Sequence, residues 1–346
     1  MSRLHLANRK SIGTRLARAG VLGALRPLHD GVRKPVVVLA YHRVMPTPDV
    51  ENYPFDTGLL SATPEEFDWQ MRLISRDFDP IALSDIASYL RGRFALPKRP
   101  IVVTFDDGYD DNFYHAFPIL KHHGVPATIF ATVGLVGTSD LHWHDWAAYL
   151  VLRGQRGEIP TVTGPQTIAP SDTIASRRLL VRRFLQFLKT RPHAELLSIL
   201  SAMREQHADS IRPSELGQAR LLSWDQMRTM ASSVVQFGSH SMSHSILSRL
   251  GPDELREELT RSKALLEHNL NTQCHSIAYP VGRSFAYTPE ILCEVGLAGY
   301  RLGLAYNSGI NWAHALDLFA LQRQTVESHT DRDYFRAMVN LPMWFH

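Results

Sequence analysis

The amino-acid sequence predicts an α/β protein built around parallel strands. Runs made almost entirely of apolar residues, rich in β-branched side chains, are typical of strands that are covered on both faces, as at 35–40 and 102–105. Such runs alternate with helical patterns on either side of a middle region that interrupts them. The number of strand–helix units favours a barrel over a small open sheet, although spacing alone does not decide between the two.

In the first half of the chain, the strand at 35–40 is followed by a well-marked helix start. Ser61–Glu66 contains a hydroxyl cap, a proline for the first turn and acids near the positive end of the helix dipole. A short strand at 81–83 and a capped helix then repeat the cycle. The strand at 102–105 runs into Asp106 and Asp107, where the following glycine allows a turn. A helix at 116–123 and a strand at 127–132 complete this half.

The middle region, about 138–220, does not follow the alternation. A Gly/Pro-rich loop at 154–170 precedes a helical run from 171 to about 206 in which basic and apolar residues interleave. We interpret it as an inserted helical subdomain with a solvated charged face. A lid, or a surface on which an anionic polymer or lipid lies, is the alternative. We refer to residues 138–220 as the inserted region.

The strand–helix alternation resumes after the inserted region. The pattern at 223–227 is typical of a helix start, and an amphipathic helix covers 252 to about 270. The remaining expected elements are strands at 234–238 and 276–280, a helix from about 287 to 295, and late strands at 300–305 and 319–323.

The composition is that of an ordinary globular protein of 346 residues, with 44% hydrophobic residues. A formal net charge of +3 is too small to indicate a nucleic-acid partner. Only Cys274 and Cys293 are present, so neither a disulfide framework nor a cysteine-rich zinc site is expected. Any metal ion must therefore be held by histidine and carboxylate.

Residues 1–34 form a basic N-terminal arm, distinct from the domain predicted at 35–346. Eight Lys or Arg residues accompany a single acid, Asp30. The segment 14–28 can form a basic amphipathic helix on an anionic membrane, and a disordered or packed arm is the alternative. Its apolar run is too short to span a bilayer and lacks a signal-peptide cleavage site. We therefore expect a cytoplasmic protein, in peripheral contact with the inner membrane through this arm.

Titratable residues follow several of the predicted strands. His42, the pair Asp106 and Asp107, and the pair His240 and His244 each follow an apolar run. In parallel α/β barrels the carboxyl ends of the strands converge on one face, so we expect these residues to meet. Two imidazoles at i and i+4 with a carboxylate from another strand suit a hydrolytic metal site that keeps open positions.

Each part of this pattern has an ordinary explanation when taken alone. An i,i+4 histidine pair is often a surface feature, and an Asp-Asp-Gly turn is commonly solvated. Their joint occurrence at successive strand ends favours the metal site. His142 and His144 lie beside tryptophans at the start of the inserted region, and we expect them to pack rather than to bind metal.

The segments Thr104–Gly108 and His240–His244 resemble the two leading motifs of the polysaccharide deacetylase family, the NodB-homology carbohydrate esterases of family 4. The opening Val38–Val44 resembles the branch that contains poly-N-acetylglucosamine deacetylases. The resemblance implies a distorted (β/α)7 barrel and a divalent metal ion, most often Zn²⁺. It implies the metal ligands Asp107, His240 and His244, the catalytic base Asp106 and the general acid His42.

The third motif departs from the family pattern. Where the family has an arginine that helps to build the pocket, this chain has Ala278. Arg323 or Arg283 could replace that arginine beside Asp106. We expect substrate or oxyanion contacts from Tyr109, Tyr279, Pro280, Val281, Arg283 and Arg323.

The predicted function is hydrolysis of N-acetyl groups on an amino-sugar polysaccharide or a lipid-linked glycan precursor. In this mechanism a metal-bound water attacks the acetamide, with Asp106 as base and His42 as acid. One alternative keeps the fold and hydrolyses a non-carbohydrate amide. The other is a non-catalytic glycan-binding protein, which is disfavoured because binding alone requires none of the metal-ligating residues.

Overall fold

The computed structural model describes residues 11–16, 18 and 34–345. The predicted arm helix at 14–28 and its membrane contact therefore lie largely outside the described residues. In the described part of the arm, residues 11–16 are helical and Leu16 packs against the main core. Arg18 donates a 3.0 Å hydrogen bond to Asp333. Within the described ranges, no helix combines the length and apolar character that crossing a membrane requires.

The predicted parallel α/β barrel is confirmed. Its sheet runs in the order β11, β10, β9, β6, β5, β1, with β13 parallel to β1 on its other side and an isolated parallel bridge from Leu304 to Leu321. That bridge joins β11 to the segment just before β13, so the parallel sheet curls back toward β1. The parallel strands are β1 (Pro35–Tyr41), β5 (Pro100–Phe105), β6 (Ala127–Ala131), β9 (Val235–Ser239), β10 (Ser276–Ala278), β11 (Leu302–Leu304) and β13 (Gln324–Thr325).

Both faces of the strands are buried, as the all-apolar runs predict. Val37 and Leu39 of β1 belong to one hydrophobic cluster, whereas Val36 and Val38 belong to another. Alternate side chains of a strand point to opposite faces, so a strand between two apolar layers needs apolar residues at every position. Short strands at the margins are β2 (Arg43–Val44) with β3 (Leu60–Ala62), β4 (Asp79–Pro80) on β5, and β12 (Asn311–Trp312), antiparallel on β1.

Helices cover the outside of the barrel, and their ends follow the capping signals. Thr63 and Glu66 form a reciprocal capping box at the start of α3, as the sequence predicts. Ser223 and Gln226 do the same for α10. The helices are α3 (Pro64–Asp77), α4 (Leu83–Leu90), α5 (Phe117–His123), α10 (Trp224–Ala231), α11 (Pro252–Leu270), α12 (Pro289–Leu297) and α13 (Arg332–Asn340).

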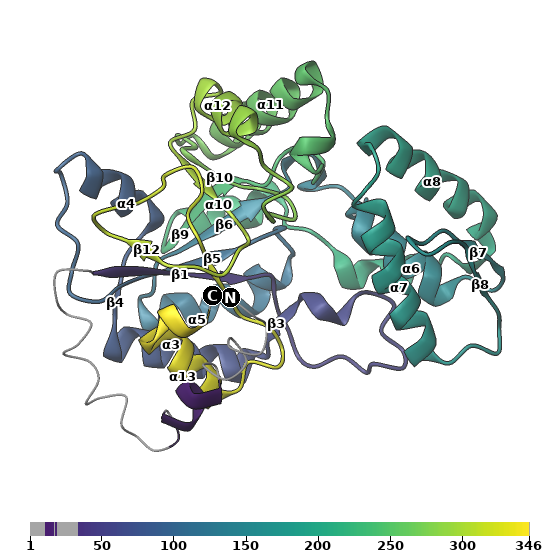
Figure 1. Ribbon diagram of the computed structural model, residues 1–346, viewed down its shortest axis with the longest axis horizontal. Coiled ribbons are helices and arrows are strands. Elements are labelled where there is room, and N and C mark those ends of the chain that lie inside the picture. The colour runs from purple at the N-terminus through teal and green to yellow at the C-terminus, as the bar shows by residue number, and fades with distance from the viewer. Residues whose placement is uncertain (1–10, 17, 19–33, 346) are drawn as a thin grey trace.

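The elements of the inserted region lie to one side of the sheet (Figure 1, right). They share a hydrophobic cluster that includes Tyr149 and Phe184 and is separate from the cluster around β1 and β5. The loop between β2 and β3 reaches this side and receives hydrogen bonds from Arg178 at three of its carbonyls. The elements are α6 (Trp143–Arg153), β7 (Gly157–Ile159), β8 (Gln166–Ile168), α7 (Ile174–Leu188), α8 (His193–Gln206) and α9 (Pro213–Leu216).

Three element predictions were wrong in detail. The helical run 171–206 is two helices, because Pro192 has no N–H to donate and starts a new helix instead of continuing α7. The strand predicted at 81–83 is displaced to β4, because the Asp85 carboxylate caps the Ala82 N–H and starts α4. The strand predicted at 319–323 is only the Leu321 bridge, next to β13.

Candidate active site and metal centre

The five residues that follow the predicted strands meet at one cavity of about 320 Å³. His42 follows β1, Asp106 and Asp107 follow β5, and His240 and His244 follow β9. All five line this cavity, which we call the strand-end cavity. The convergence expected from parallel strands is therefore present.

The two histidines of the second motif face one carboxylate oxygen. Asp107 Oδ1 lies 3.4 Å from His240 Nε2 and 3.2 Å from His244 Nε2. His240 Nδ1 lies 2.8 Å from the carbonyl oxygen of Ala278, which can only accept, so Nδ1 donates and Nε2 of the neutral ring carries its lone pair toward Asp107. Asp107 Oδ1 is buried and has no hydrogen-bond partner within the described structure.

These distances fit a divalent cation. Ligand bonds of about 2.0–2.2 Å place the ligand atoms of a tetrahedral zinc site about 3.4 Å apart. Burial raises the pKa of the Asp107 carboxyl, but His240 and His244 outweigh burial and hold it well below its usual range. Burial lowers the pKa of His244 to about 4, so its imidazole is neutral at pH 7. Burial lowers the pKa of His240, but Asp106 and Asp107 outweigh burial and the net shift is upward, so metal binding at its Nε2 would release a proton there.

Unusual backbone conformations are concentrated at this site. Five non-glycine residues of the described chain have positive φ, and four of them lie in the site motifs: Asp107 (74°), Ser241 (63°), His244 (59°) and Val281 (65°). A left-handed conformation is unfavourable for β-branched valine, and such strain is typical of functional sites. At Asp107 the left-handed conformation has a direct structural effect. It turns the chain so that the adjacent carboxylates of Asp106 and Asp107 face one cavity instead of opposite faces of the sheet.

Asp106 is held by an arginine from the end of the chain. Arg323 Nη1 and Nη2 donate to the two carboxylate oxygens at 2.7 Å each, and both side chains are buried. Burial raises the pKa of Asp106, but Arg323 and His240 outweigh burial, and the net shift is downward. The sequence left Arg323 and Arg283 open as partners of Asp106. The structure places Arg323 there, while Arg283 is exposed at the cavity wall.

His42 is anchored through its backbone and its ring. Its N–H donates to Ser61 Oγ at 2.9 Å, and its carbonyl accepts from Asn112 Nδ2 at 2.9 Å. The imidazole packs edge-on against Tyr306, with 5.2 Å between ring centroids. Tyr306 also lines the strand-end cavity, and the sequence analysis did not identify it.

The remaining predicted residues divide into two groups. Tyr279, Val281 and Arg283 line the strand-end cavity. Tyr109 and Pro280 are buried but do not belong to its lining.

The Tyr109 hydroxyl reaches the start of α6. It donates to Asp145 Oδ2 at 2.8 Å and lies 3.0 Å from His144 Nε2. The rings of His142 and His144 are buried and stacked at 4.8 Å, and His144 packs against His244 at the same centroid distance. Together with Asp145, they form a second group whose potential metal-ligand atoms lie within 4.8 Å of one another. The Tyr109 hydroxyl contacts two of these three residues.

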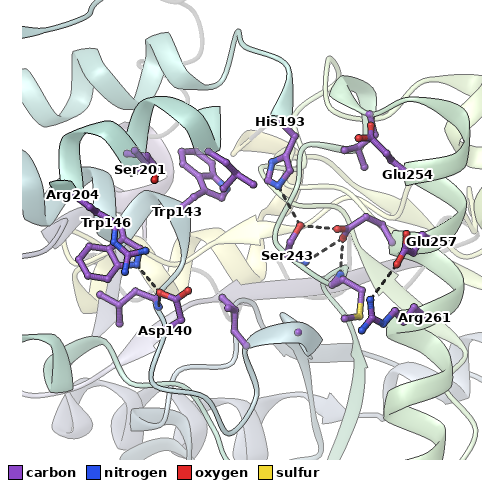
Figure 2. A pocket seen from close by; sticks show the side chains of 18 residues that line it. Asp140, Trp143, Trp146, His193, Ser201, Arg204, Ser243, Glu254, Glu257 and Arg261 are labelled. Atoms are coloured by element: carbon purple, nitrogen blue, oxygen red, sulfur yellow. Dashed lines mark hydrogen bonds and ion pairs between the residues drawn. The ribbon is translucent and has the colours of Figure 1, made fainter. Parts of the chain in front are cut away.

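Glu258 on α11 fixes the segment between His240 and His244. Its carboxylate accepts from the N–H groups of Met242 and Ser243 at 2.7 and 3.1 Å and from Ser243 Oγ at 2.6 Å. Ser243 Oγ also lies 3.5 Å from Nε2 of His193, the first residue of α8. Figure 2 shows these two side chains next to each other. The sequence analysis missed Glu258, because an acid on an amphipathic helix has the pattern of a solvated face.

The sequence model described as polysaccharide deacetylase matches residues 95–302. The chain belongs to the polysaccharide deacetylase family. Members of this family are metal-dependent hydrolases that act on N-acetylated glycans, and the Asp107 group is a fitting metal site. The match contains Asp106, Asp107, His240 and His244, whereas His42 and Arg323 lie outside it and reach the site only through the fold.

Two curated relatives illustrate the range of similarity. The putative polysaccharide deacetylase YxkH of Bacillus subtilis (strain 168) is 23% identical over 242 residues, covering 70% of this chain and 57% of that protein. The poly-beta-1,6-N-acetyl-D-glucosamine N-deacetylase of Escherichia coli (strain K12) is 33% identical over 98 residues, covering 28% of this chain and 14% of that enzyme. The alignments therefore span less than two thirds of either relative.

Solved structures show the same fold. The Streptococcus pyogenes deacetylase PplD in complex with acetate has a TM-score of 0.58 at 20% identity, covering 89% of this chain and 99% of that one. IcaB from Ammonifex degensii has a TM-score of 0.55 at 20% identity, covering 89% and 97%. The predicted NodB-type fold is thus confirmed, and at this identity the likeness concerns the fold alone.

Proposed function

We propose that this protein is a zinc-dependent N-deacetylase that removes acetyl groups from an amino-sugar polysaccharide or a lipid-linked glycan precursor. The observation that carries the proposal is the Asp107–His240–His244 group beside an arginine-bound Asp106 in one cavity. Relatives named for deacetylation of poly-N-acetylglucosamine support the substrate class.

Asp107, His240 and His244 would hold the metal ion. When bound, a divalent cation lowers the pKa of water and polarises a carbonyl oxygen. The chain's own contribution is to keep the ligands in place: the Ala278 carbonyl fixes the tautomer of His240, and Glu258 fixes the segment that leads to His244.

Asp106 is the general base. Because Arg323 holds its pKa below the usual value, the carboxylate is unprotonated at pH 7 and can accept a proton from the attacking water. The water oxygen then bonds to the acetamide carbon. Arg323 is a positioning residue, because it occupies one lone pair on each oxygen and holds the carboxylate plane toward the cavity.

His42 is the general acid and donates a proton to the leaving nitrogen. As the carbon–nitrogen bond breaks, the leaving nitrogen takes this proton, and the products are acetate and a free amino sugar. Val281 lines the cavity in a left-handed conformation, and we assign its N–H to the negative charge that develops on the carbonyl oxygen.

Acetate release tests the proposal. Wild type should release acetate from N-acetylglucosamine oligomers, and Asp106→Asn should lower the rate by about 10²- to 10⁴-fold with one metal ion per chain retained. Full activity in Asp106→Asn would contradict the base assignment. Hydrolysis of simple amides but not of the oligomers would favour the non-carbohydrate alternative. Absence of both stoichiometric metal and acetate release would favour a glycan-binding protein.

A further inference from the structure

Part of the wall of the strand-end cavity comes from the inserted region. Leu185, in the last turn of α7, and Lys189, its C-cap residue, line the cavity together with the catalytic residues. Arg283, in the loop after β10, lines the same cavity. Two basic residues from different parts of the fold therefore face the space that the proposed function gives to the substrate.

Neither of these two cations forms an ion pair within 4.0 Å in the described chain. The Lys189 ammonium makes no hydrogen bond or ion pair there, and the Arg283 guanidinium lies 5.6 Å from the ring centre of Tyr306. Burial lowers the pKa of Lys189, and the positive charge of Arg283 lowers it further, whereas Asp56 opposes both. Lys189 is half-buried, so its ammonium loses part of its hydration without gaining an ion pair, whereas Arg283 is exposed to solvent.

The acids on the same wall are better satisfied. Asp56 accepts a 2.9 Å hydrogen bond from the Gly58 N–H, and Glu327 Oε2 lies 3.4 Å from His329 Nδ1. Neither forms an ion pair with Lys189 or Arg283 within 4.0 Å. The Lys189 ammonium and the Arg283 guanidinium therefore have hydrogen-bond donors available to an anionic ligand in this cavity.

Other basic residues of α7 show that Lys189 is a special case. Arg177 and Arg178 each donate to several backbone carbonyls, and Arg183 donates to Gln166. Arg182 is exposed to solvent. A lysine at a helix C-terminus also interacts favourably with the helix dipole, but that effect requires no placement in the cavity wall.

We propose that the substrate carries an anionic group, a phosphate ester or a carboxylate, that Lys189 and Arg283 bind while the acetamide lies at the Asp107 metal site. This inference rests on the proposed function and narrows its substrate class. Phosphate and carboxylate oxygens both accept charge-assisted hydrogen bonds from ammonium and guanidinium groups. The inserted region would thus contribute to substrate selection through Lys189, whereas the reacting groups would come from the barrel.

The test compares acetate release from three matched N-acetylglucosamine oligomers: neutral, carrying one phosphate ester, or carrying one uronate unit. Wild type should prefer one anionic substrate, and the preferred one identifies the group. Lys189→Ala and Arg283→Ala should each lower the ratio of kcat/KM for that substrate over the neutral one by about 10- to 100-fold. Lys189→Arg, which keeps the positive charge, should restore most of this ratio.

Arg182→Ala is the matched control, because it removes one positive charge from an exposed position of the same helix. The control should leave the ratio unchanged. A wild-type preference for the neutral oligomer, or an unchanged ratio in Lys189→Ala, would overturn the inference.

Absence of acetate release from all three oligomers would instead count against the proposed function. Calorimetric binding of inorganic phosphate to the metal-loaded full chain then decides the anion site independently. Any metal contribution is common to all variants, so binding weakened in Lys189→Ala but not in Arg182→Ala supports the site. Equal binding in both contradicts it.

Discussion

The barrel and the inserted region both contribute side chains to the strand-end cavity, but they hold them differently. In the barrel, the Asp106 carboxylate accepts hydrogen bonds from Arg323, and His240 Nδ1 donates one to the Ala278 carbonyl. In the inserted region, Trp143 Nε1 donates a hydrogen bond to the His244 carbonyl, whereas the Lys189 ammonium has no hydrogen-bond or ion-pair partner in the described chain. The side chains at the strand ends are thus fixed by buried hydrogen bonds, whereas the Lys189 ammonium of the inserted region is not.

This difference indicates that the barrel and the inserted region have separate roles, the barrel in the reaction and the inserted region in substrate selection. Proton transfer and metal binding depend on tenths of an ångström, which a packed sheet with buried hydrogen bonds can maintain. Selection among substrates depends on charge and shape around the reacting atoms, which a separate hydrophobic cluster on helices can vary without disturbing the sheet. Substitutions at three positions test this difference.

The largest effect is expected from Arg323→Leu in the barrel. It leaves Asp106 buried without its cation, so we expect a loss of about 3–5 kcal/mol of stability and about a 10²- to 10⁴-fold fall in kcat/KM. Without Arg323, burial raises the pKa of Asp106, so the acidic limb of the pH–rate profile should move to higher pH. Kinetics and thermal unfolding of the purified variant measure both effects.

Arg323→Lys is the control for Arg323→Leu. It keeps one positive charge but loses the two-pronged geometry, so it should recover stability more fully than rate. An Arg323→Leu variant whose acidic limb does not move would show that Asp106 does not depend on this arginine.

A smaller effect on the reaction is expected from Phe184→Ala in the inserted region. Phe184 is fully buried in the separate cluster, and its truncation should destabilise that cluster by about 3–5 kcal/mol. Hydrogen exchange should accelerate in α7 and α8, while the barrel strands stay protected and the metal content is unchanged. Loss of metal together with α7 protection would show that the two regions fold as one cooperative unit.

The smallest effect concerns the junction of the two regions. The Asp110 N–H donates to the Arg220 carbonyl, where the chain returns from the insertion. Burial, followed by repulsion from Asp111, raises the pKa of Asp110 to about 6. The native state therefore binds this proton more tightly than the unfolded chain, and the associated stability is lost as pH rises from about 4 to about 6.

Asp110→Asn should abolish this dependence of the free energy of unfolding on pH. Because the side chain is only partly buried, the gain in stability at pH 7 should be about 1 kcal/mol, with no gain at pH 4. Denaturant unfolding at the two pH values measures it. An equal change at both values would mean that the substitution acts through packing rather than through charge.

Local patterns determined much of this fold. The all-apolar runs marked strands buried on both faces, and the capping residues Thr63 and Ser223 marked helix starts. Both signals depend on neighbouring residues only, so they can be recognised without the fold. The same holds for the Asp-Asp-Gly and His240–His244 segments, since parallel strands bring their carboxyl ends together.

Only the tertiary structure decided which distant side chains complete the site. Arg323 and Arg283 were equivalent in the sequence, and Asp106 meets Arg323 because closure of the sheet returns the last strands beside β1. Glu258 and Lys189 lie on helices whose amphipathic pattern predicts a solvated face. Periodicity along a segment determines which face is buried, whereas contacts between segments depend on how the whole sheet closes and where the insertion packs.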